Sequence, residues 1–344
     1  MRHSGAGWHG LNVAAKIGLV VGGAVMLLAA ASGPAGREAR AQAPQKFTIR
    51  IAHSSAKGHW TDLASEKFAE LIAQRSDGRF APRVYPGGQL GGERDIAEGV
   101  LMGSVEVQPV STILANWVPK VAILDLPYLY RDMEHIRKVH AGPVGQELKR
   151  LLLEKGIRVM GMYHQPPRIT LTKRPVKKLE DYKGMKMRAP EIDVYIAAIR
   201  GLGATPTIVP WPEVYTSLQT GVAEGVEVDA GAHYTMKFYE IAKYATLTRH
   251  ITQTIFFNIA EKFYQSLPAD LRKVVDTSGA ETCDYLNQVT EAKDQEMLEK
   301  LKSVGVTVTE IDLTQARLNL AALHEEFGRK LGASDLIKQI KETR

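Results

Sequence analysis

The stretch from residue 185 to residue 229 constrains the fold of this chain more than any other part of the sequence. Residues 185–188 alternate methionine with a basic residue, as in a strand that has one apolar face, and Pro190 ends that strand. Apolar residues then recur at helical spacing over residues 191–202, and a β-branched run covers Thr205–Val209. Strand–helix–strand alternation with such short connections predicts an α/β fold with a parallel sheet.

The carboxyl ends of these predicted strands carry Arg188, Trp211 and the segment Glu227–Asp229. Ligands of open parallel sheets normally lie beyond the carboxyl ends of the strands, so this edge of the sheet is the predicted binding site. Two alternatives compete with that interpretation. Arg188 can be a solvated arginine at the edge of the sheet, and Trp211 can be an ordinary core side chain.

The sequence contains no recognisable catalytic signature. A G-x-S-x-G turn does not occur, and the segment His324-Glu325-Glu326 lacks the second histidine of the zinc-protease motif. The histidines show no metal-ligand spacing, and the glycine-rich turn at residues 86–93 matches neither phosphate-loop pattern. The sequence therefore favours a binding protein over an enzyme and predicts neither a metal nor a cofactor.

The charge pattern does not favour nucleic-acid binding. The formal net charge is +6, and the densest basic run, residues 173–186, is interleaved with Glu180 and Asp181. Such a mixed run is typical of a solvated face. Cys283 is the single cysteine, which excludes a disulfide within the chain.

The first forty or so residues have the pattern of a cleavable signal peptide. An apolar run over residues 17–31 follows basic residues, and Ala39-Arg40-Ala41 offers a small-x-small site, so we expect cleavage after Ala41 and export to the periplasm. A retained membrane anchor is the alternative, but the run is shorter than the roughly 18–20 residues that span a bilayer. Loss of residues 1–41 removes four basic residues and one acidic residue, which lowers the formal charge from +6 to +3.

The segment LEDYKGMKMRAP, followed by GLGATPTIVPWPEVYTSLQTGVAEG, resembles the signature region of one receptor family. This family is the DctP-type solute receptors of tripartite ATP-independent periplasmic (TRAP) transporters, whose pattern runs K-G-x-K-x-R-x-P, L-G-A-x-P and P-x-x-E-V-Y-x-x-L-Q-T-G. Residues 85–93 resemble the family's F-P-x-G-Q-L-G turn, with Tyr85 in place of Phe. The resemblance covers almost everything from Phe47 to the carboxyl end and weakens after Lys300.

The resemblance implies a two-lobe periplasmic binding protein whose chain crosses between the lobes and ends in long helices. Lobe I is expected at residues 44–165 plus about 253–294, and lobe II at residues 166–252 plus about 295–344. The two crossings would form a hinge. We also expect the helical tract after Pro268 to break at Gly279.

The function implied by the resemblance is binding of a small organic acid and its delivery to the membrane permease subunits of the transporter. We expect a monomer that binds no nucleic acid. Three alternatives stay open: the binding protein of an ATP-driven (ABC-type) importer, a secreted enzyme acting on organic acids, and a receptor that serves a signalling partner.

The resemblance also assigns roles to particular residues. Arg188 would hold the carboxylate of the ligand, because a guanidinium offers a planar fork that matches two carboxylate oxygens. Trp211 would pack over the body of the ligand, and Arg168 corresponds to a second cationic position in some members. Three first-lobe residues align with positions that contact ligand in some relatives: His53, Glu93 and Ser111.

The chain departs from the family pattern at residues 225–229. Many members read G-Q-E-N-P there, whereas this chain reads Gly-Val-Glu-Val-Asp. Val228 replaces an asparagine that often bonds the ligand and can only pack, while Asp229 brings a negative charge. If Asp229 faces the cleft, it disfavours a second carboxylate, so we expect a monocarboxylate with an apolar, aromatic or hydroxylated body rather than a C4-dicarboxylate. If Asp229 faces away, it merely caps the following helix.

Overall fold

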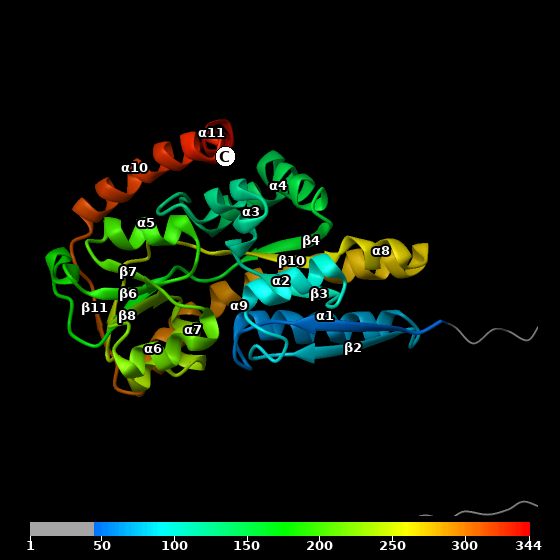
Figure 1. Cartoon of the computed structure of the whole chain (residues 1–344), viewed down its shortest axis with the longest axis horizontal. Coiled ribbons are helices and arrows are strands. Elements are labelled where there is room, and N and C mark those ends of the chain that lie inside the picture. Colours follow the sequence, from blue (N-terminus) through cyan, green and yellow to red (C-terminus); the bar gives the residue numbers. More distant parts are fainter. Residues whose placement is uncertain (1–44) are drawn as a thin grey trace, which may run out of the picture. The chain divides into compact units, whose positions relative to one another are not determined.

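Two β-sheets organise residues 45–344, which are the residues that the computed structural model describes (Figure 1). The predicted signal peptide lies outside the described residues. The first sheet has the strand order β2-β1-β3-β10-β4. Its strands are β1 (Phe47–Ala52), β2 (Phe80–Tyr85), β3 (Val107–Val110), β4 (Ile157–His164) and β10 (Thr254–Ala260).

The second sheet has the order β11-β9-β5-β8-β6-β7. Strand β6 pairs in parallel with both β7 and β8, which confirms the parallel arrangement predicted for residues 185–229. The bounds of these strands are β5 (Ile169–Thr172), β6 (Lys186–Ala189), β7 (Thr205–Ile208), β8 (Gly225–Val228), β9 (Tyr244–Thr246) and β11 (Thr307–Thr309).

The chain passes from the first sheet to the second between β4 and β5 and returns between β9 and β10. Strand β10 then inserts antiparallel between β3 and β4, so the returning chain becomes an inner strand of the first sheet. The predicted lobe boundaries follow these crossings, and their positions stay predictions.

The helices cover both sheets, and the C-terminal helices pack back onto earlier ones. Helix α10 contacts α5, and α11 contacts α4. No helix within residues 45–344 combines the length and apolar composition that a membrane span needs. The helices are α1 (Trp60–Arg75), α2 (Glu93–Met102), α3 (Met133–Ala141), α4 (Pro143–Leu153), α5 (Asp193–Gly201), α6 (Val214–Thr220), α7 (Ala230–Thr235), α8 (Glu261–Ser266), α9 (Ala269–Ser303), α10 (Thr314–Lys330) and α11 (Ser334–Glu342).

Helix α9 is continuous over 35 residues, so the predicted break at Gly279 is wrong. The glycine instead allows α9 to approach β4 closely: a Cβ at position 279 would lie 2.6 Å from Cβ of Met160. A second glycine on β4, Gly161, faces Cys283 of α9 in the same way, because a Cβ there would lie 2.6 Å from the Cys283 Sγ. These two glycines serve close packing rather than helix termination.

Helix α7 is short and covers only six residues. It ends at Thr235, and Lys237 adopts the left-handed conformation with φ 58°, after which only a short 3₁₀ turn follows. A left-handed residue cannot continue an α-helix. Phe238, the first residue of that 3₁₀ turn, is fully buried.

Candidate functional site

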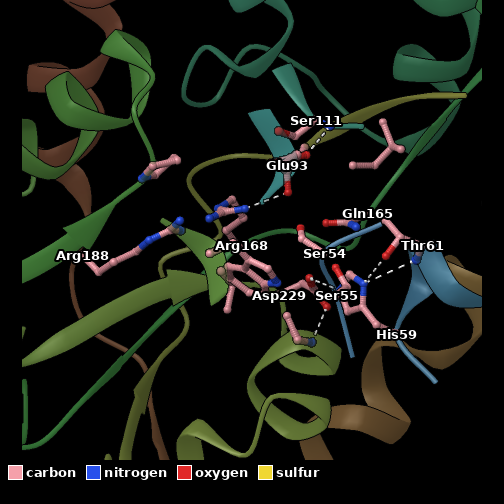
Figure 2. Close-up of a pocket in the computed structure, with 16 residues that line it drawn as sticks. Ser54, Ser55, His59, Thr61, Glu93, Ser111, Gln165, Arg168, Arg188 and Asp229 are labelled. Atoms are coloured by element: carbon pink, nitrogen blue, oxygen red, sulfur yellow. Dashed lines mark hydrogen bonds and ion pairs between the residues drawn. The ribbon is translucent and has the colours of Figure 1, made fainter. Parts of the chain in front are cut away.

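A pocket lies between the two sheets and takes residues from both (Figure 2). Its cavity volume is about 60 Å³, far below the roughly 300–1,000 Å³ of sites for drug-sized ligands. The pocket therefore suits a small, compact molecule. The lining residues are Ser54, Ser55, His59, Thr61, Glu93, Ser111, Gln165, Arg168, Arg188, Pro190, Trp211, Val228, Asp229, Ala232, Gln253 and Ile255.

Arg188 lies on β6 and reaches the pocket with a buried side chain, 3% exposed. Its Nε–H donates to the carbonyl of Val209 at 2.9 Å, and the guanidinium lies 5.4 Å from the centre of the Trp211 ring. No other hydrogen bond from this guanidinium to a side chain or carbonyl of residues 45–344 is present. The solvated-edge interpretation of Arg188 is therefore wrong, and its terminal N–H groups stay available to an acceptor in the pocket.

Electrostatics around Arg188 favour a bound anion. Burial, and then the like charge of Arg168, lowers the pKa of Arg188 to about 10, so the guanidinium still carries its charge at neutral pH. A buried cation without a carboxylate in direct contact is costly unless a partner arrives. A carboxylate that bonded its free N–H groups would supply that partner.

Arg168 differs from Arg188, because each of its three guanidinium nitrogens already donates to a protein group. Its Nε–H donates to Glu227 at 2.5 Å, a second nitrogen donates to the other carboxylate oxygen at 3.0 Å, and a third bond reaches Gln253 at 2.8 Å. Burial alone would raise the pKa of Glu227, but Arg168 and the nearby His250, whose Nε2 lies 3.4 Å from Glu227 Oε2, lower it to about 2. Arg168 and Glu227 thus form a buried ion pair at the wall of the pocket.

Glu93, the first residue of α2, and Ser111, which directly follows β3, also line the pocket. The backbone N–H of Ser111 donates to Glu93 Oε1 at 2.7 Å. Burial raises the pKa of Glu93 above its usual value, although this bond and the charge of Arg188 oppose the rise. Glu93 can therefore present a carboxyl group to a ligand in the pocket.

Asp229 both caps α7 and lines the pocket, although capping and facing the cleft were expected to exclude each other. Its Oδ1 accepts the backbone N–H of Ala232 at 3.0 Å, which caps α7, and the indole N–H of Trp60 at 2.7 Å. Burial alone would raise the pKa of Asp229, but the neighbouring His59, the Trp60 indole and the Ala232 N–H lower it. Asp229 is therefore an anion at the wall of the pocket.

The structure brings six of the eight predicted site residues together: Arg188, Arg168, Trp211, Asp229, Glu93 and Ser111. The other two, Glu227 and His53, do not line the pocket. Glu227 pairs with Arg168, and His53 Nε2 lies 3.2 Å from Asp62 Oδ1. Glu227 and His53 therefore contact other side chains rather than the pocket. Direct contact of any of the eight residues with a ligand stays a prediction.

Several lining residues were not predicted from the sequence. His59 precedes the first turn of α1, and Gln165 and Gln253 lie on the crossing segments between β4 and β5 and between β9 and β10. A polar residue in a loop has no periodicity that would set it apart from other loop residues. The predicted crossings between the lobes could have indicated Gln165 and Gln253, because the segments that join the lobes of a two-lobe protein border its cleft.

Metal-ligating residues do not cluster in the described part of the chain: residues 45–344 contain no group of three or more His, Cys, Asp and Glu side chains that could hold a metal ion. The pocket presents charged and hydrogen-bonding side chains beside apolar ones such as Trp211 and Ile255. Two sheets joined by crossing segments, with a small pocket and a buried cation between them, define the class of two-lobe solute-binding proteins.

Comparison with known proteins identifies the family. The sequence model of the bacterial extracellular solute-binding proteins, family 7 (DctP), matches residues 51–331, and the chain belongs to this family. A solute-binding protein of Roseobacter denitrificans is 32% identical over 286 residues, which are 83% of this chain and 88% of that protein. The C4-dicarboxylate-binding periplasmic protein DctP of Rhodobacter capsulatus is 30% identical, over 85% of this chain and 88% of that protein.

Solved structures show the same fold. A TRAP periplasmic solute-binding protein from Bordetella bronchispeptica, with density interpreted as pantoate, has a TM-score of 0.83 and 28% identity, and the match covers 87% of this chain and all of that one. The Roseobacter denitrificans protein with bound L-galactonate has a TM-score of 0.81 and 29% identity, with 86% and 99% covered. The two-lobe fold and the TRAP receptor class are thereby confirmed, and the ABC-type alternative is set aside.

Proposed function

We propose that this chain is a periplasmic receptor that binds a small organic acid by its carboxylate and hands it to the membrane permease of a TRAP transporter. The observation that carries the proposal is the buried, charged Arg188, whose terminal N–H groups face the pocket. The acids named for related structures, pantoate and L-galactonate, each carry a carboxylate. The chain would act after loss of its signal peptide, and it would bind its ligand without chemical change.

Closure of the two lobes would bring the site together. Lining residues come from both sides of the pocket, and contacts beside it join the two sides: Trp60 of α1 bonds Asp229, and Arg94 of α2 pairs with Glu191 at 3.1 Å. An acid that bridges the lobes would add its own contacts to these. Removal of water on closure would strengthen the attraction between Arg188 and the carboxylate.

A thermal-shift screen of the mature chain against small organic acids tests the proposal. A ligand present at 100 times its dissociation constant stabilises the folded state by about 2.7 kcal/mol, which is a clear rise in the unfolding temperature. We expect at least one acid to give such a rise and its methyl ester to give none. If the ester stabilises the chain as well as the free acid, the carboxylate is not the recognised group.

Gly231→Ala should weaken binding of that acid about tenfold. A Cβ at position 231 would lie 2.6 Å from the rigid ring of Trp60, so α7 and α1 could not approach as closely. Overpacking of this kind typically costs about 1–3 kcal/mol, and here the cost falls on the closed arrangement. Calorimetric titration measures the affinity, and circular dichroism verifies that the variant is folded. A folded variant with unchanged affinity would show that this contact does not limit closure.

A further inference from the structure

We propose that His59 and Asp229 together form a subsite for a hydroxyl group on the ligand, so that the receptor selects hydroxylated monocarboxylates over dicarboxylates and plain carboxylates. The inference rests on the proposed function, because it assumes that Arg188 holds the carboxylate. Both residues line the pocket and both are buried, His59 at 4% and Asp229 at 1% exposed.

The hydrogen bonds of His59 identify which ring nitrogen carries the proton. The backbone N–H of Thr61 approaches Nδ1 at 3.4 Å, and the Thr61 hydroxyl lies 3.0 Å from the same atom. A backbone N–H can only donate, so we assign Nδ1 as the acceptor and place the proton of the neutral ring on Nε2. Among residues 45–344, Nε2 has no hydrogen-bond partner, although it is buried.

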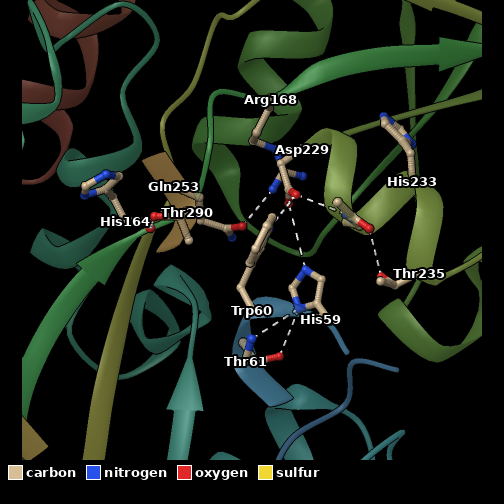
Figure 3. A network of polar contacts seen from close by, with 12 residues as sticks. His59, Trp60, Thr61, His164, Arg168, Asp229, His233, Thr235, Gln253 and Thr290 are labelled. Carbon is tan, nitrogen blue, oxygen red and sulfur yellow. Dashed lines mark hydrogen bonds and ion pairs between the residues drawn. The ribbon is translucent and has the colours of Figure 1, made fainter. Parts of the chain in front are cut away.

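Asp229 supplies the complementary acceptor. Trp60 and Ala232 both donate to Oδ1, which fixes the carboxylate in place and leaves Oδ2 toward His59 (Figure 3). The separation between Oδ2 and His59 Nε2 is 3.9 Å, too long for a direct hydrogen bond. A donor and an acceptor therefore face each other across a short gap. A hydroxyl group fits this pair, because it can accept from Nε2–H and donate to Oδ2 at the same time.

The position of the pair within the pocket suits a hydroxyl on the body of the acid. Figure 2 shows Arg188 on one side of the pocket and His59 with Thr61 on the other. An acid whose carboxylate bonds Arg188 would thus extend toward His59 and Asp229. A second carboxylate at that end would meet the Asp229 anion, and an apolar end would leave Nε2–H and Oδ2 buried without partners.

Two matched sets of acids test the subsite on the wild-type mature chain by calorimetric titration. The four-carbon set is D-erythronate, butyrate and succinate, and the six-carbon set is L-galactonate, hexanoate and adipate. Within each set the acids share chain length and differ in hydroxylation or in the second carboxylate. We expect one hydroxylated acid to bind at least about a hundredfold more tightly than both of its counterparts, since a site built to bond a hydroxyl strongly rejects analogues without it.

The substitution Asp229→Asn tests the role of Asp229 Oδ2 as the acceptor for the ligand hydroxyl. Asparagine keeps an oxygen that can cap α7 and accept from Trp60, but it replaces Oδ2 by an amide that donates. We expect the preference for the hydroxylated acid to fall at least about tenfold. The matched control is Asp132→Asn, because Asp132 caps α3 through the backbone N–H of His135 at 2.7 Å and does not line the pocket. This control should leave the preference unchanged.

The outcomes distinguish failure of the subsite proposal from failure of the proposed function. A preference for succinate, adipate or a plain acid would overturn the subsite and leave the carboxylate receptor intact. An unchanged preference in folded Asp229→Asn would also overturn the subsite. If none of the six acids binds and no acid of the wider thermal-shift screen does, the proposed function falls and the subsite falls with it. Should Asp229→Asn fail to fold, the wild-type preferences decide alone.

Discussion

Replacement of Arg188 by alanine should weaken binding of the cognate acid at least about thirtyfold. The side chain is buried, and the only protein acceptor of its guanidinium within residues 45–344 is the carbonyl of Val209. Truncation of one partner of a buried, hydrogen-bonded charge pair costs roughly 2–5 kcal/mol, because the other charge is left desolvated and unpaired. Calorimetric titration of the variant with the acid from the thermal-shift screen measures the loss.

Two further variants serve as comparisons in the same titration. Arg188→Lys keeps the charge but loses the planar fork, so we expect an affinity between those of wild type and Arg188→Ala. Arg200→Ala removes an exposed arginine from α5 and should leave the affinity unchanged. An Arg188→Ala variant that binds the acid as tightly as wild type would remove Arg188 from the site.

Glu227→Gln should lower the free energy of unfolding of the ligand-free chain by about 3–5 kcal/mol. The substitution leaves Arg168 charged and buried without its partner, and the loss of one member of a buried ion pair is strongly destabilising. Urea unfolding at neutral pH measures the change. The control is Glu325→Gln, which breaks an exposed pair with Arg329 and should have little effect. Equal midpoints for the two variants would contradict this role of the pair.

The difference in unfolding free energy between wild type and Glu227→Gln should depend on pH. Since the pKa of Glu227 falls from about 4.5 to about 2 on folding, its stabilising contribution is complete above pH 4.5 and is lost as the pH falls toward 2. The gap in unfolding free energy between wild type and Glu227→Gln should therefore narrow as the pH falls below about 4.5. A gap that stays constant between pH 6 and pH 3 would show that the carboxylate is not held ionised by Arg168.

The sequence predicted those parts of the fold that depend on local pattern. Alternation at residues 185–188, followed by a helical period, indicated the parallel pairing of β6 with β7, because both signals act within a few residues. The same pattern placed Arg188 at the end of a strand. It could not show that Arg188 is buried while Lys186, on the same face of the strand, is exposed, because that difference depends on neighbours distant in the sequence, such as Val209 and Trp211.

The local sequence pattern could not predict contacts between segments that are distant in the chain. The pairing of Arg168 with Glu227 joins residues 59 positions apart, and the bond of Trp60 to Asp229 joins residues 169 positions apart. Neither pair has a local signature. Gly279 shows the opposite problem: glycine disfavours a helix locally, which suggested a break, and only the proximity of Met160 on β4 reveals its packing role.

The central claim is that the pocket between the sheets holds an acid by its carboxylate on Arg188. A crystal structure of the mature chain with the tightest-binding acid of the screen tests this claim most directly. We expect the carboxylate oxygens at about 2.7–3.0 Å from the terminal nitrogens of Arg188, with the body of the acid toward His59 and Asp229. An acid bound elsewhere on the chain, or in the pocket with its carboxylate turned away from Arg188, would contradict it.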